Sequence, residues 1–177
     1  LTLYGAKGHA MQTLAATTLT LNTTTAFLGG VALLQAVAAL KGPAFEANAL
    51  GACVCVVAFL HYTWIRSTDD AAERVRLRYG DWIVTCPLLL WELHATTGVE
   101  GQEWALGATA LMVLLGYAAV RSVGWKRHAL FAVSSLVLAA IVAATLSGAK
   151  KNGELVAAFF GVWALYPVAF LFYSNVA

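Results

Sequence analysis

The sequence predicts an all-α protein, a polytopic transmembrane helical bundle with six spans. Hydrophobic residues make up 60% of the 177 residues and charged residues only 11%, and the mean hydropathy is +0.75. A soluble domain of this length could not bury so much apolar surface. The apolar residues also gather into stretches of about 20 residues, the length that a helix needs to cross a bilayer. We therefore expect an integral, multi-pass protein of the cell membrane, with the lipid bilayer as its surroundings.

The expected spans follow one another without an internal repeat. The first is rich in threonine, whose hydroxyls can bond to the preceding turn or to a neighbouring helix, and we favour a packing role for them. Lys41-Gly42-Pro43 ends this span, because proline cannot continue a helix. The charged stretch Arg66–Arg76 is expected to be a loop, and further loops are expected at residues 98–103, 121–127 and 150–153. The spans are expected at residues 11–40, 45–65, 77–94, 104–120, 128–147 and 154–177, and together they form a single domain over residues 1–177.

Composition excludes several classes of partner and site. The net charge of +2 is too small to indicate a nucleic-acid partner. Cys53, Cys55 and Cys86 lie in apolar segments, and the tight Cys53-Val54-Cys55 spacing lacks the second ligand pair of a metal site. We interpret the cysteines as packing residues and expect no metal. The first ten residues lack the apolar core of a signal peptide, so no cleavable leader is expected.

The third span carries a row of polar and charged residues that an apolar helix would normally avoid. At about 100° per residue, Arg78, Asp81, Thr85 and Glu92 fall within roughly 60° of one another on a helix. Asp81 and Glu92 are three turns apart, roughly 16 Å along the axis. Charges at membrane depth are costly and usually face a bundle interior or a water-filled path. Titratable groups along one inward face are what a proton relay requires.

Two further residues stand out near this row. His61, near the end of the second span, is either a packed, hydrogen-bonded side chain or a functional partner of the carboxylates on the next helix, and the sequence leaves both readings open. Pro87 lies inside the third span and removes one backbone hydrogen bond, which leaves the carbonyl of Ile83 to another donor. Membrane helices tolerate such a proline where a side chain or water satisfies that carbonyl.

Three motifs identify a resemblance. The stretch RYGDWIVTCPLLLWE at residues 78–92 resembles the third helix of microbial rhodopsins, and WALYP at residues 163–167 resembles their sixth helix. AFLHY at residues 58–62 resembles the second helix of proteorhodopsins. The first motif is long and specific, the second is moderately so, and with weaker matches the resemblance covers the whole chain.

The resemblance implies a role for each residue of the polar row. Asp81 corresponds to the primary counterion and acceptor of the Schiff-base proton, and Thr85 to its hydrogen-bond partner. Glu92 corresponds to the cytoplasmic proton donor, and a glutamate there is the proteorhodopsin-like choice. His61 corresponds to the histidine that pairs with the counterion, and Arg78 to the extracellular-side arginine that steers the released proton.

The resemblance also implies a pocket for all-trans-retinal. Trp82 and Trp163 correspond to the two rings that sandwich the polyene. Leu89 falls at the colour-tuning position, where leucine implies green rather than blue absorption, and the bulky Phe131 argues against a carotenoid antenna beside the ring. The other residues implied around the cofactor are Tyr62, Met112, Gly116, Ser134, Leu138, Tyr166, Pro167 and Phe170.

The chain departs from the family pattern in one respect. Microbial rhodopsins have seven helices, and the seventh carries the lysine that binds retinal together with a second aspartate. No Asp, Glu or Lys follows Glu154 in this sequence. We expect the given chain to be part of a longer one; a lysine-free, six-helix relative, which could bind retinal only non-covalently, is the alternative. The lysines of the sequence all lie at expected loops or ends: Lys7, Lys41, Lys126, Lys150 and Lys151.

The charges of the loops and the order of Asp81 and Glu92 in the third span predict opposite orientations of the chain in the membrane. Eight of the eleven Lys and Arg residues fall on the N-terminal side of the membrane, which by the positive-inside rule is the cytoplasmic side. The family has its N-terminus outside. We follow the motif, because Arg78 is expected inside the bundle and because Asp81 and Glu92 must lie on opposite sides of the chromophore in a fixed order.

The sequence therefore predicts a light-driven outward proton pump, a transporter rather than an enzyme. Its expected partners are retinal, protons, the bilayer and, by family resemblance, further copies of itself in a trimer or pentamer. A photosensory rhodopsin is the first alternative, and it is disfavoured by Glu92, because a carboxylic donor is usually dispensable to a sensor. A light-gated ion channel and a six-helix structural protein are the remaining alternatives.

Overall fold

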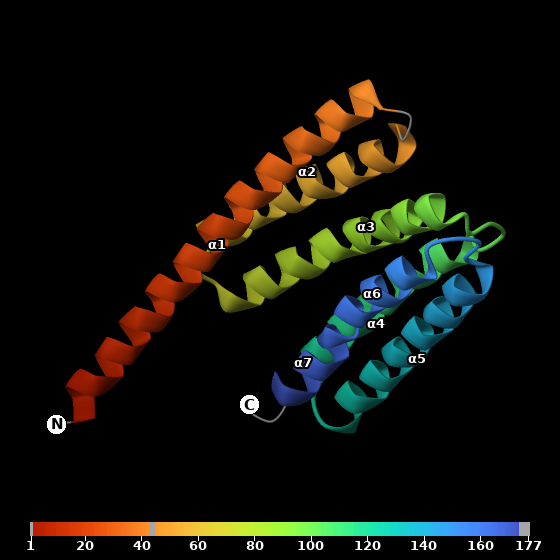
Figure 1. Cartoon of the computed structure of the whole chain (residues 1–177). Coiled ribbons are helices and arrows are strands. Elements are labelled where there is room, and N and C mark those ends of the chain that lie inside the picture. The colour runs from red at the N-terminus through yellow and green to blue at the C-terminus, as the bar shows by residue number, and fades with distance from the viewer. Residues whose placement is uncertain (1, 43–44, 174–177) are drawn as a thin grey trace. The chain divides into compact units, whose positions relative to one another are not determined.

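The computed structural model describes residues 2–42 and 45–173, with the side chains of most residues from Leu19 onward. Every regular element in this part of the chain is a helix, which confirms the all-α prediction (Figure 1). Residues 1–81 and 82–177 form two compact units, and the single-domain organisation stays a prediction. The helices are α1 (Thr2–Lys41), α2 (Phe45–Ser67), α3 (Ala71–Thr97), α4 (Trp104–Arg121), α5 (Trp125–Gly148), α6 (Gly153–Trp163) and α7 (Leu165–Tyr173).

In the first unit, α1 and α2 run side by side in opposite directions (Figure 1). Two of the threonines of α1 bond to the preceding turn: the Thr23 and Thr25 hydroxyls donate to carbonyls four residues earlier, at 2.8 and 2.7 Å, and the packing role stays a prediction. At one point of their contact, glycine leaves room for an aromatic ring. A Cβ on Gly29 would lie 3.2 Å from the Phe59 ring, so this ring packs directly on the α1 backbone.

We expect Gly29→Val to lower the melting temperature of the protein in detergent or nanodiscs. The added side chain must displace the Phe59 ring, and overpacking of a well-packed contact costs about 1–3 kcal/mol. Gly30→Val is the matched control, because a Cβ on Gly30 meets nothing within 4 Å. Equal melting temperatures for the two variants would show that the α1–α2 contact at Gly29 is not tight.

The start of α3 corrects the predicted loop at residues 66–76. Only residues 68–70 separate α2 from α3, and α3 begins at Ala71. The Asp70 carboxylate accepts the Ala72 N–H at 2.9 Å, which satisfies one of the donors left open at a helix start. Arg76 donates to Glu73 one turn earlier at 2.8 Å, and this bond holds the pKa of Glu73 below its usual range. The charged residues for which the sequence predicted a loop therefore form the capped, solvated first turns of a helix.

The second unit is built around one cluster of buried apolar side chains. Leu90 and Leu93 of α3 contribute to it together with Ile141 of α5. The cluster also includes Ala105 of α4 and, from α6, the buried Val156 and Phe160. Helices α4 and α5 form a hairpin, and α6 packs on α5 (Figure 1). The C-terminal half of α3 is thus fixed by packing, even though Pro87 lies within it.

The last predicted span, residues 154–177, is interrupted. Helix α6 ends at Trp163, and α7 begins at Leu165. Pro167 explains the position of the break, because its missing N–H and its ring disturb the helix at the carbonyl four residues earlier, which is that of Trp163. The end of the predicted span, residues 174–177, lies outside the described residues.

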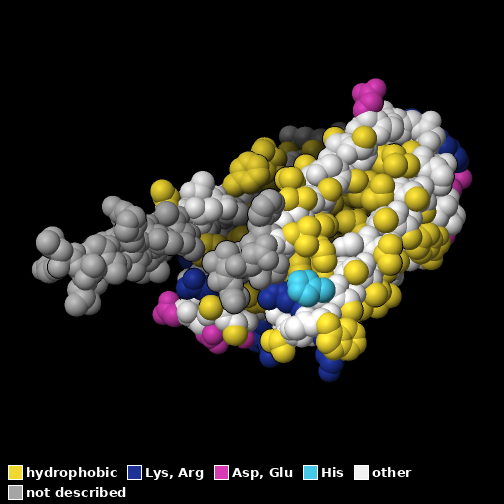
Figure 2. Space-filling model, turned by 90° about the horizontal axis from the view of Figure 1, so that it is seen from below, with side chains coloured by type: hydrophobic (Ala, Val, Ile, Leu, Met, Phe, Trp, Pro, Cys, Tyr) yellow, Lys and Arg dark blue, Asp and Glu magenta, His cyan; other side chains and the backbone are white. Residues whose placement is uncertain are grey.

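The surface of the helices suits a lipid solvent. Among the described residues, four helical segments are long and apolar enough to cross a membrane: Leu19–Leu40, Phe45–Ser67, Trp104–Arg121 and Trp125–Gly148. Large apolar side chains such as Leu111, Leu136 and Leu146 are exposed on them. Figure 2 shows hydrophobic side chains spread over the helix surfaces. Helix α3 does not meet this simple criterion, and its charged residues include Arg78, Asp81 and Glu92, which the sequence singled out.

Candidate functional site

Helix α3 carries the predicted proton-handling residues at positions that helical periodicity puts on one face. Asp81 is only 3% exposed and Thr85 is also buried, whereas Glu92 is half-buried. Burying a carboxylate is costly unless charged or hydrogen-bonding groups compensate it. Burying Asp81 and Thr85 inside an apolar protein therefore costs folding free energy. Buried polar residues of this kind are typically functional. Arg78 differs from expectation, since its side chain is exposed in the described part of the chain.

His61 of α2 lies against Asp81 within the first unit. The His61 Nδ1 and the Asp81 Oδ1 are 4.0 Å apart, and the same Nδ1 lies 3.0 Å from the backbone carbonyl of Val57. Gly80 of α3 also lies near the ring, since a Cβ there would be in ordinary van der Waals contact with the His61 Nε2, at 3.8 Å. The imidazole is thus held at ion-pair distance from the carboxylate. The Val57 contact fits a packed, hydrogen-bonded side chain and the Asp81 contact fits a functional partner, so both interpretations of His61 stay open.

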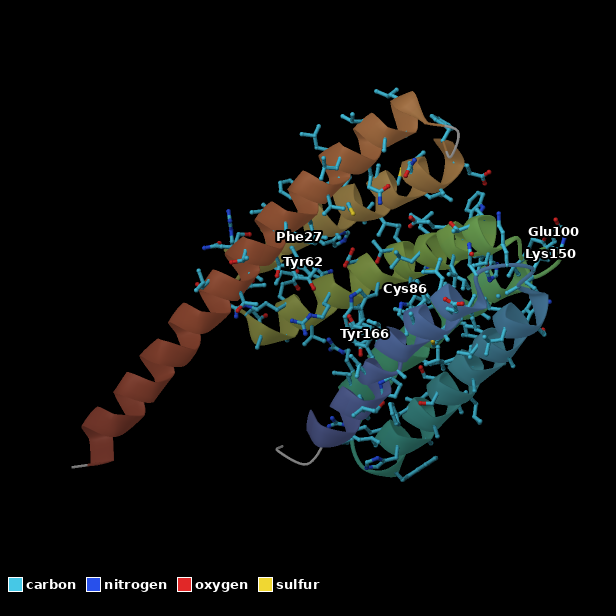
Figure 3. The ribbon with its side chains drawn as sticks, in the orientation of Figure 1. Phe27, Tyr62, Cys86, Glu100, Lys150 and Tyr166 are labelled. Atoms are coloured by element: carbon cyan, nitrogen blue, oxygen red, sulfur yellow. The ribbon has the colours of Figure 1, made fainter. Side chains whose placement is uncertain are left out.

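Tyr62, the neighbour of His61, belongs to the same polar group. Its hydroxyl is within electrostatic range of both Arg78 and Asp81. Figure 3 labels Tyr62 on α2. The first unit thus brings together four of the residues that the sequence predicted for the site, from two helices.

Aromatic residues predicted to line the cofactor pocket contact one another in the second unit. Trp82 of α3 and Tyr166 of α7 meet edge to face, with ring centroids 4.8 Å apart. Phe131 of α5 and Phe170 of α7 stack with centroids 4.2 Å apart and planes 5° from parallel. Such pairs contribute about 0.5–1.5 kcal/mol beyond the burial of their area. Helix α7 is therefore held by an aromatic contact to α3 and another to α5.

The remaining predicted pocket residues differ in their surroundings. Met112, Leu138 and Trp163 pack against the buried apolar cluster of the second unit, and Trp163 also lies 4.8 Å from the Phe159 ring. Ser134 donates to the backbone carbonyl of Met112 at 2.9 Å and so ties α5 to α4. The others are partly exposed residues of α3, α4 and α7: Leu89, Gly116 and Pro167.

The structure also contains contacts that the sequence did not predict. The buried His94 places its Nε2 3.1 Å from the hydroxyl of Thr145, which links α3 to α5. Arg127 lies over the Phe170 ring, 5.0 Å from its centroid. His94 follows Glu92 by two positions, and this spacing turns it away from the carboxylate face. The only signal in the sequence was a single histidine in the third span, and nothing identified its partner 51 residues away.

Two turns of the second unit are joined near the C-terminal end of α3. The Lys150 Nζ lies 2.8 Å from the Glu100 carboxylate, and Figure 3 labels both side chains. The backbone N–H of Lys150 also donates to the Thr97 carbonyl at 3.1 Å. The hydrogen bond from Lys150 holds the pKa of Glu100 below its ordinary value of 4.5. These contacts connect the α3–α4 turn to the α5–α6 turn, beyond the end of the helix that carries Glu92.

We expect the Glu100–Lys150 pair to make stability fall on acidification. A carboxylate whose pKa is lowered in the folded state contributes fully above its ordinary pKa, and its contribution is lost as the pH falls through the lowered value. Thermal melting between about pH 6 and pH 3 should therefore show a smaller acid-induced decrease for Glu100→Gln than for the wild type. The effect is small because both side chains are exposed. Glu103→Gln is the control, and identical pH profiles for wild type and Glu100→Gln would contradict the prediction.

The sequence model of the family described as bacteriorhodopsin-like protein matches residues 13–177 of this chain. The chain belongs to this family. The microbial rhodopsin resemblance predicted from the three motifs is thereby confirmed, and so is the prediction of an integral, multi-pass membrane protein.

The names of similar proteins include both sensory rhodopsins and bacteriorhodopsins. "Sensory rhodopsin" of Halorubrum sodomense is 35% identical over 120 residues, covering 63% of this chain and 47% of that protein. "Bacteriorhodopsin" of Haloterrigena sp. (strain arg-4) is 33% identical over 118 residues, covering 58% of this chain and 47% of its own length. This microbial rhodopsin chain thus spans about half the length of the curated relatives that it matches.

Solved structures support the fold of this microbial rhodopsin chain. Cyanorhodopsin N4075R from Tolypothrix sp. NIES-4075 aligns with a TM-score of 0.73 at 19% identity, covering 87% of this chain and 77% of that one. The transmembrane domain of Salpingoeca rosetta rhodopsin phosphodiesterase aligns with a TM-score of 0.68 at 18% identity, covering 81% and 60%. At these identities the likeness establishes the fold alone.

Proposed function

We propose that this chain is part of a light-driven outward proton pump that binds all-trans-retinal. The observation that carries the proposal is the polar row of α3 with a histidine beside it. Asp81 is buried, Thr85 follows one turn later, and the His61 imidazole lies 4.0 Å from the Asp81 carboxylate. Glu92 stands three turns from Asp81 on the same face by helical periodicity. An acceptor and a donor at opposite ends of one helix face are the minimum that directional proton transfer requires.

The residues present fit retinal in two respects. Aromatic side chains from α3, α5 and α7 offer flat apolar surfaces to a polyene, and Asp81 offers a buried carboxylate to a cationic linkage. When bound, retinal supplies light absorption and an isomerisation that changes its environment. Covalent attachment needs an amine, and the lysines of this sequence occupy helix ends and turns or, for Lys7, the N-terminal quarter of α1. The residues present therefore fit retinal as apolar walls of its pocket and as the counterion of its positive charge.

The chain's own residues divide the proton work between them. Asp81 accepts a proton, and the Thr85 hydroxyl, one turn along, is placed to hydrogen-bond its carboxyl group. The His61 imidazole lies at ion-pair distance from the Asp81 carboxylate and acts as its partner in the site. Glu92 lies among Leu88, Leu89 and Leu93 and supplies a proton from the other end of the row. Because two carboxylates in different surroundings hold protons with different strength, one can accept while the other donates.

The same proposal predicts the path of the protons, the lipid boundary and the oligomeric state. The protons move along the axis of α3, outward past Asp81 and Arg78. The exposed apolar helix surfaces meet lipid, and further copies of the chain associate with it as a trimer or pentamer. A single domain contains all six spans.

A photosensory rhodopsin is the second candidate, because several similar proteins are named sensory rhodopsins, at up to 35% identity over 120 residues. A receptor needs a long-lived light-activated state rather than fast proton return, so it has no need of Glu92. A slow photocycle that Glu92→Gln leaves unchanged would favour this candidate.

Light-induced pH change in cells or vesicles tests the proposal. With retinal bound, illumination of intact cells should acidify the medium, and a protonophore should abolish the change. A retinal-bound protein that produces no protonophore-sensitive pH change would rule out a pump. Passive photocurrents that reverse with voltage would instead identify a light-gated channel.

A further inference from the structure

The turn between α4 and α5 exposes basic and large apolar side chains together. Val123 is 86% exposed and Trp125 is 75% exposed, so neither is used for packing within the described chain. Arg121, Lys126 and His128 beside them are exposed as well. A tryptophan and a valine standing out from a charged turn are unusual for a protein surface that faces only water. We call residues 121–128 the basic turn.

The lengths of the adjoining helices place the basic turn at the level of lipid headgroups. Helix α4 runs from Trp104 to Arg121, about 26 Å, which nearly equals the hydrocarbon thickness of a bilayer. Trp104 at one end is 51% exposed, and Trp125 follows the other end by one short turn. Tryptophans gather at the two membrane–water interfaces, where the ring sits among the headgroups. The two tryptophans therefore mark the two interfaces.

Charge is unevenly distributed between the two ends of the second unit. Its carboxylates are Glu92, Glu100, Glu103 and Glu154, and no acidic residue occurs between positions 104 and 153 or after position 154. At the Glu100 end, a carboxylate pairs with Lys150. The basic turn holds Arg121, Lys126 and Arg127, and none of the ion pairs in the described residues involves them.

The two arginines of the basic turn are held by aromatic groups instead. The guanidinium of Arg121 lies 5.8 Å from the Tyr117 ring centroid, and it donates to the Tyr117 hydroxyl at 3.3 Å. Arg127 lies over Phe170, and its buried Nε has no hydrogen-bond acceptor among the described residues. Stacking on a ring orients a guanidinium and leaves its terminal NH₂ groups able to meet an anion, although the buried Nε of Arg127 is not accessible to one.

The carboxylates of the first unit's own turn are already used. Asp69 lies 3.7 Å from Arg74, and Glu73 is bonded to Arg76. Asp70 caps the start of α3. None of the ion-paired carboxylates in the described chain belongs to a pair with the basic turn, so its positive charge is available to an anion from the surroundings.

We propose that the basic turn, residues 121–128, binds the phosphate headgroup of an anionic phospholipid such as phosphatidylglycerol. Arg121, Lys126 and Arg127 contact the phosphate, while Trp125 and Val123 insert at the boundary between headgroups and acyl chains. Each basic residue near an anionic membrane surface contributes a separate increment of binding, and Arg forms paired hydrogen bonds with phosphate oxygens. The proposal is independent of the pump function.

Lipid retention in nanodiscs tests this site. The whole protein is reconstituted in phosphatidylcholine with about one quarter phosphatidylglycerol, and the retained phosphatidylglycerol is counted by native mass spectrometry. Arg121→Gln/Lys126→Gln should weaken retention about 30-fold, since it removes two charges at the surface. The charge-matched control is Arg66→Gln/Arg76→Gln, whose side chains bond to Asn22 and Glu73 within the first unit. Circular dichroism checks that both variants keep their helices.

Each outcome decides the proposal. Selective loss of phosphatidylglycerol from the basic-turn variant supports it. Equal loss from both variants would mean a diffuse attraction to positive charge, and equal retention by all would mean that the basic turn is not the site; either result overturns it. If the basic-turn variant does not fold, the wild type still decides, because raising the salt from about 0.05 to 0.5 M should release the bound lipid, and salt-insensitive retention would contradict the proposal.

Discussion

Asp81→Asn should abolish light-driven proton transport and shift the visible absorption to longer wavelength. The amide cannot accept a proton, so the first transfer of the relay is lost. It also removes the negative charge that, in the proposed site, balances a cation on the chromophore. The substitution is nearly isosteric, and the buried position of Asp81 should therefore be kept. Pumping is measured as the pH change of illuminated cells, and colour is read from the absorption spectrum of the same purified protein.

Asp69→Asn is the matched control for this experiment. Asp69 is fully exposed and pairs only with Arg74 beside it, so both pumping and colour should stay unchanged. An Asp81→Asn variant that binds retinal and pumps as the wild type does would show that another group accepts the proton. The role of Asp81 would then have to be withdrawn.

Glu92→Gln should slow the return of the proton without changing the colour. Loss of a positioned general acid typically costs a factor of 10² or more, so the late phase of the photocycle should lengthen on the order of 100-fold. The absorption maximum should hardly move, because Glu92 stands three turns from Asp81 along α3, roughly 16 Å. Flash photolysis measures the late decay, and static spectra measure the colour.

Glu103→Gln provides the comparison for Glu92. It removes an exposed glutamate from the α3–α4 turn and should leave the photocycle unaltered. A late photocycle phase that is equally fast in wild type and Glu92→Gln would remove the donor from the account and would favour a sensory role.

The sequence predicted the helical class and most helix positions, because apolar spans of membrane length leave few alternatives. It did less well at the ends of elements. The stretch 66–76 looked like a loop from its charge, yet Asp70 caps a helix there and Arg76 pairs with Glu73 within it. Local capping decides such ends, and composition alone does not reveal it.

The two prolines within predicted spans show a limit of another kind. Pro87 lies inside α3, which continues without interruption, whereas the span containing Pro167 is broken four residues before that proline. Each proline lacks the N–H that would donate to the carbonyl four residues earlier. The difference lies in tertiary packing. The residues that follow Pro87 include the buried Leu90 and Leu93 of the apolar cluster, whereas α7 packs through two partly exposed aromatic pairs.

The site itself was predictable to the extent that it lies on one helix. Helical periodicity placed Asp81, Thr85 and Glu92 together, and the resemblance added His61, which the structure puts beside Asp81. Contacts between distant positions, such as His94 with Thr145, had no signal in one sequence, because neither partner is unusual by itself. The roles of the site residues stay predictions.

Light-minus-dark infrared difference spectroscopy of the carboxyl groups tests the central claim most directly. In the retinal-bound protein, the account predicts that Asp81 gains a proton after illumination and that Glu92 loses one later. The first carboxyl band should be missing from Asp81→Asn and the second from Glu92→Gln. If the protein acidified its medium in the light while neither band changed in these variants, the proton would be taking another path, and the relay along α3 would be wrong.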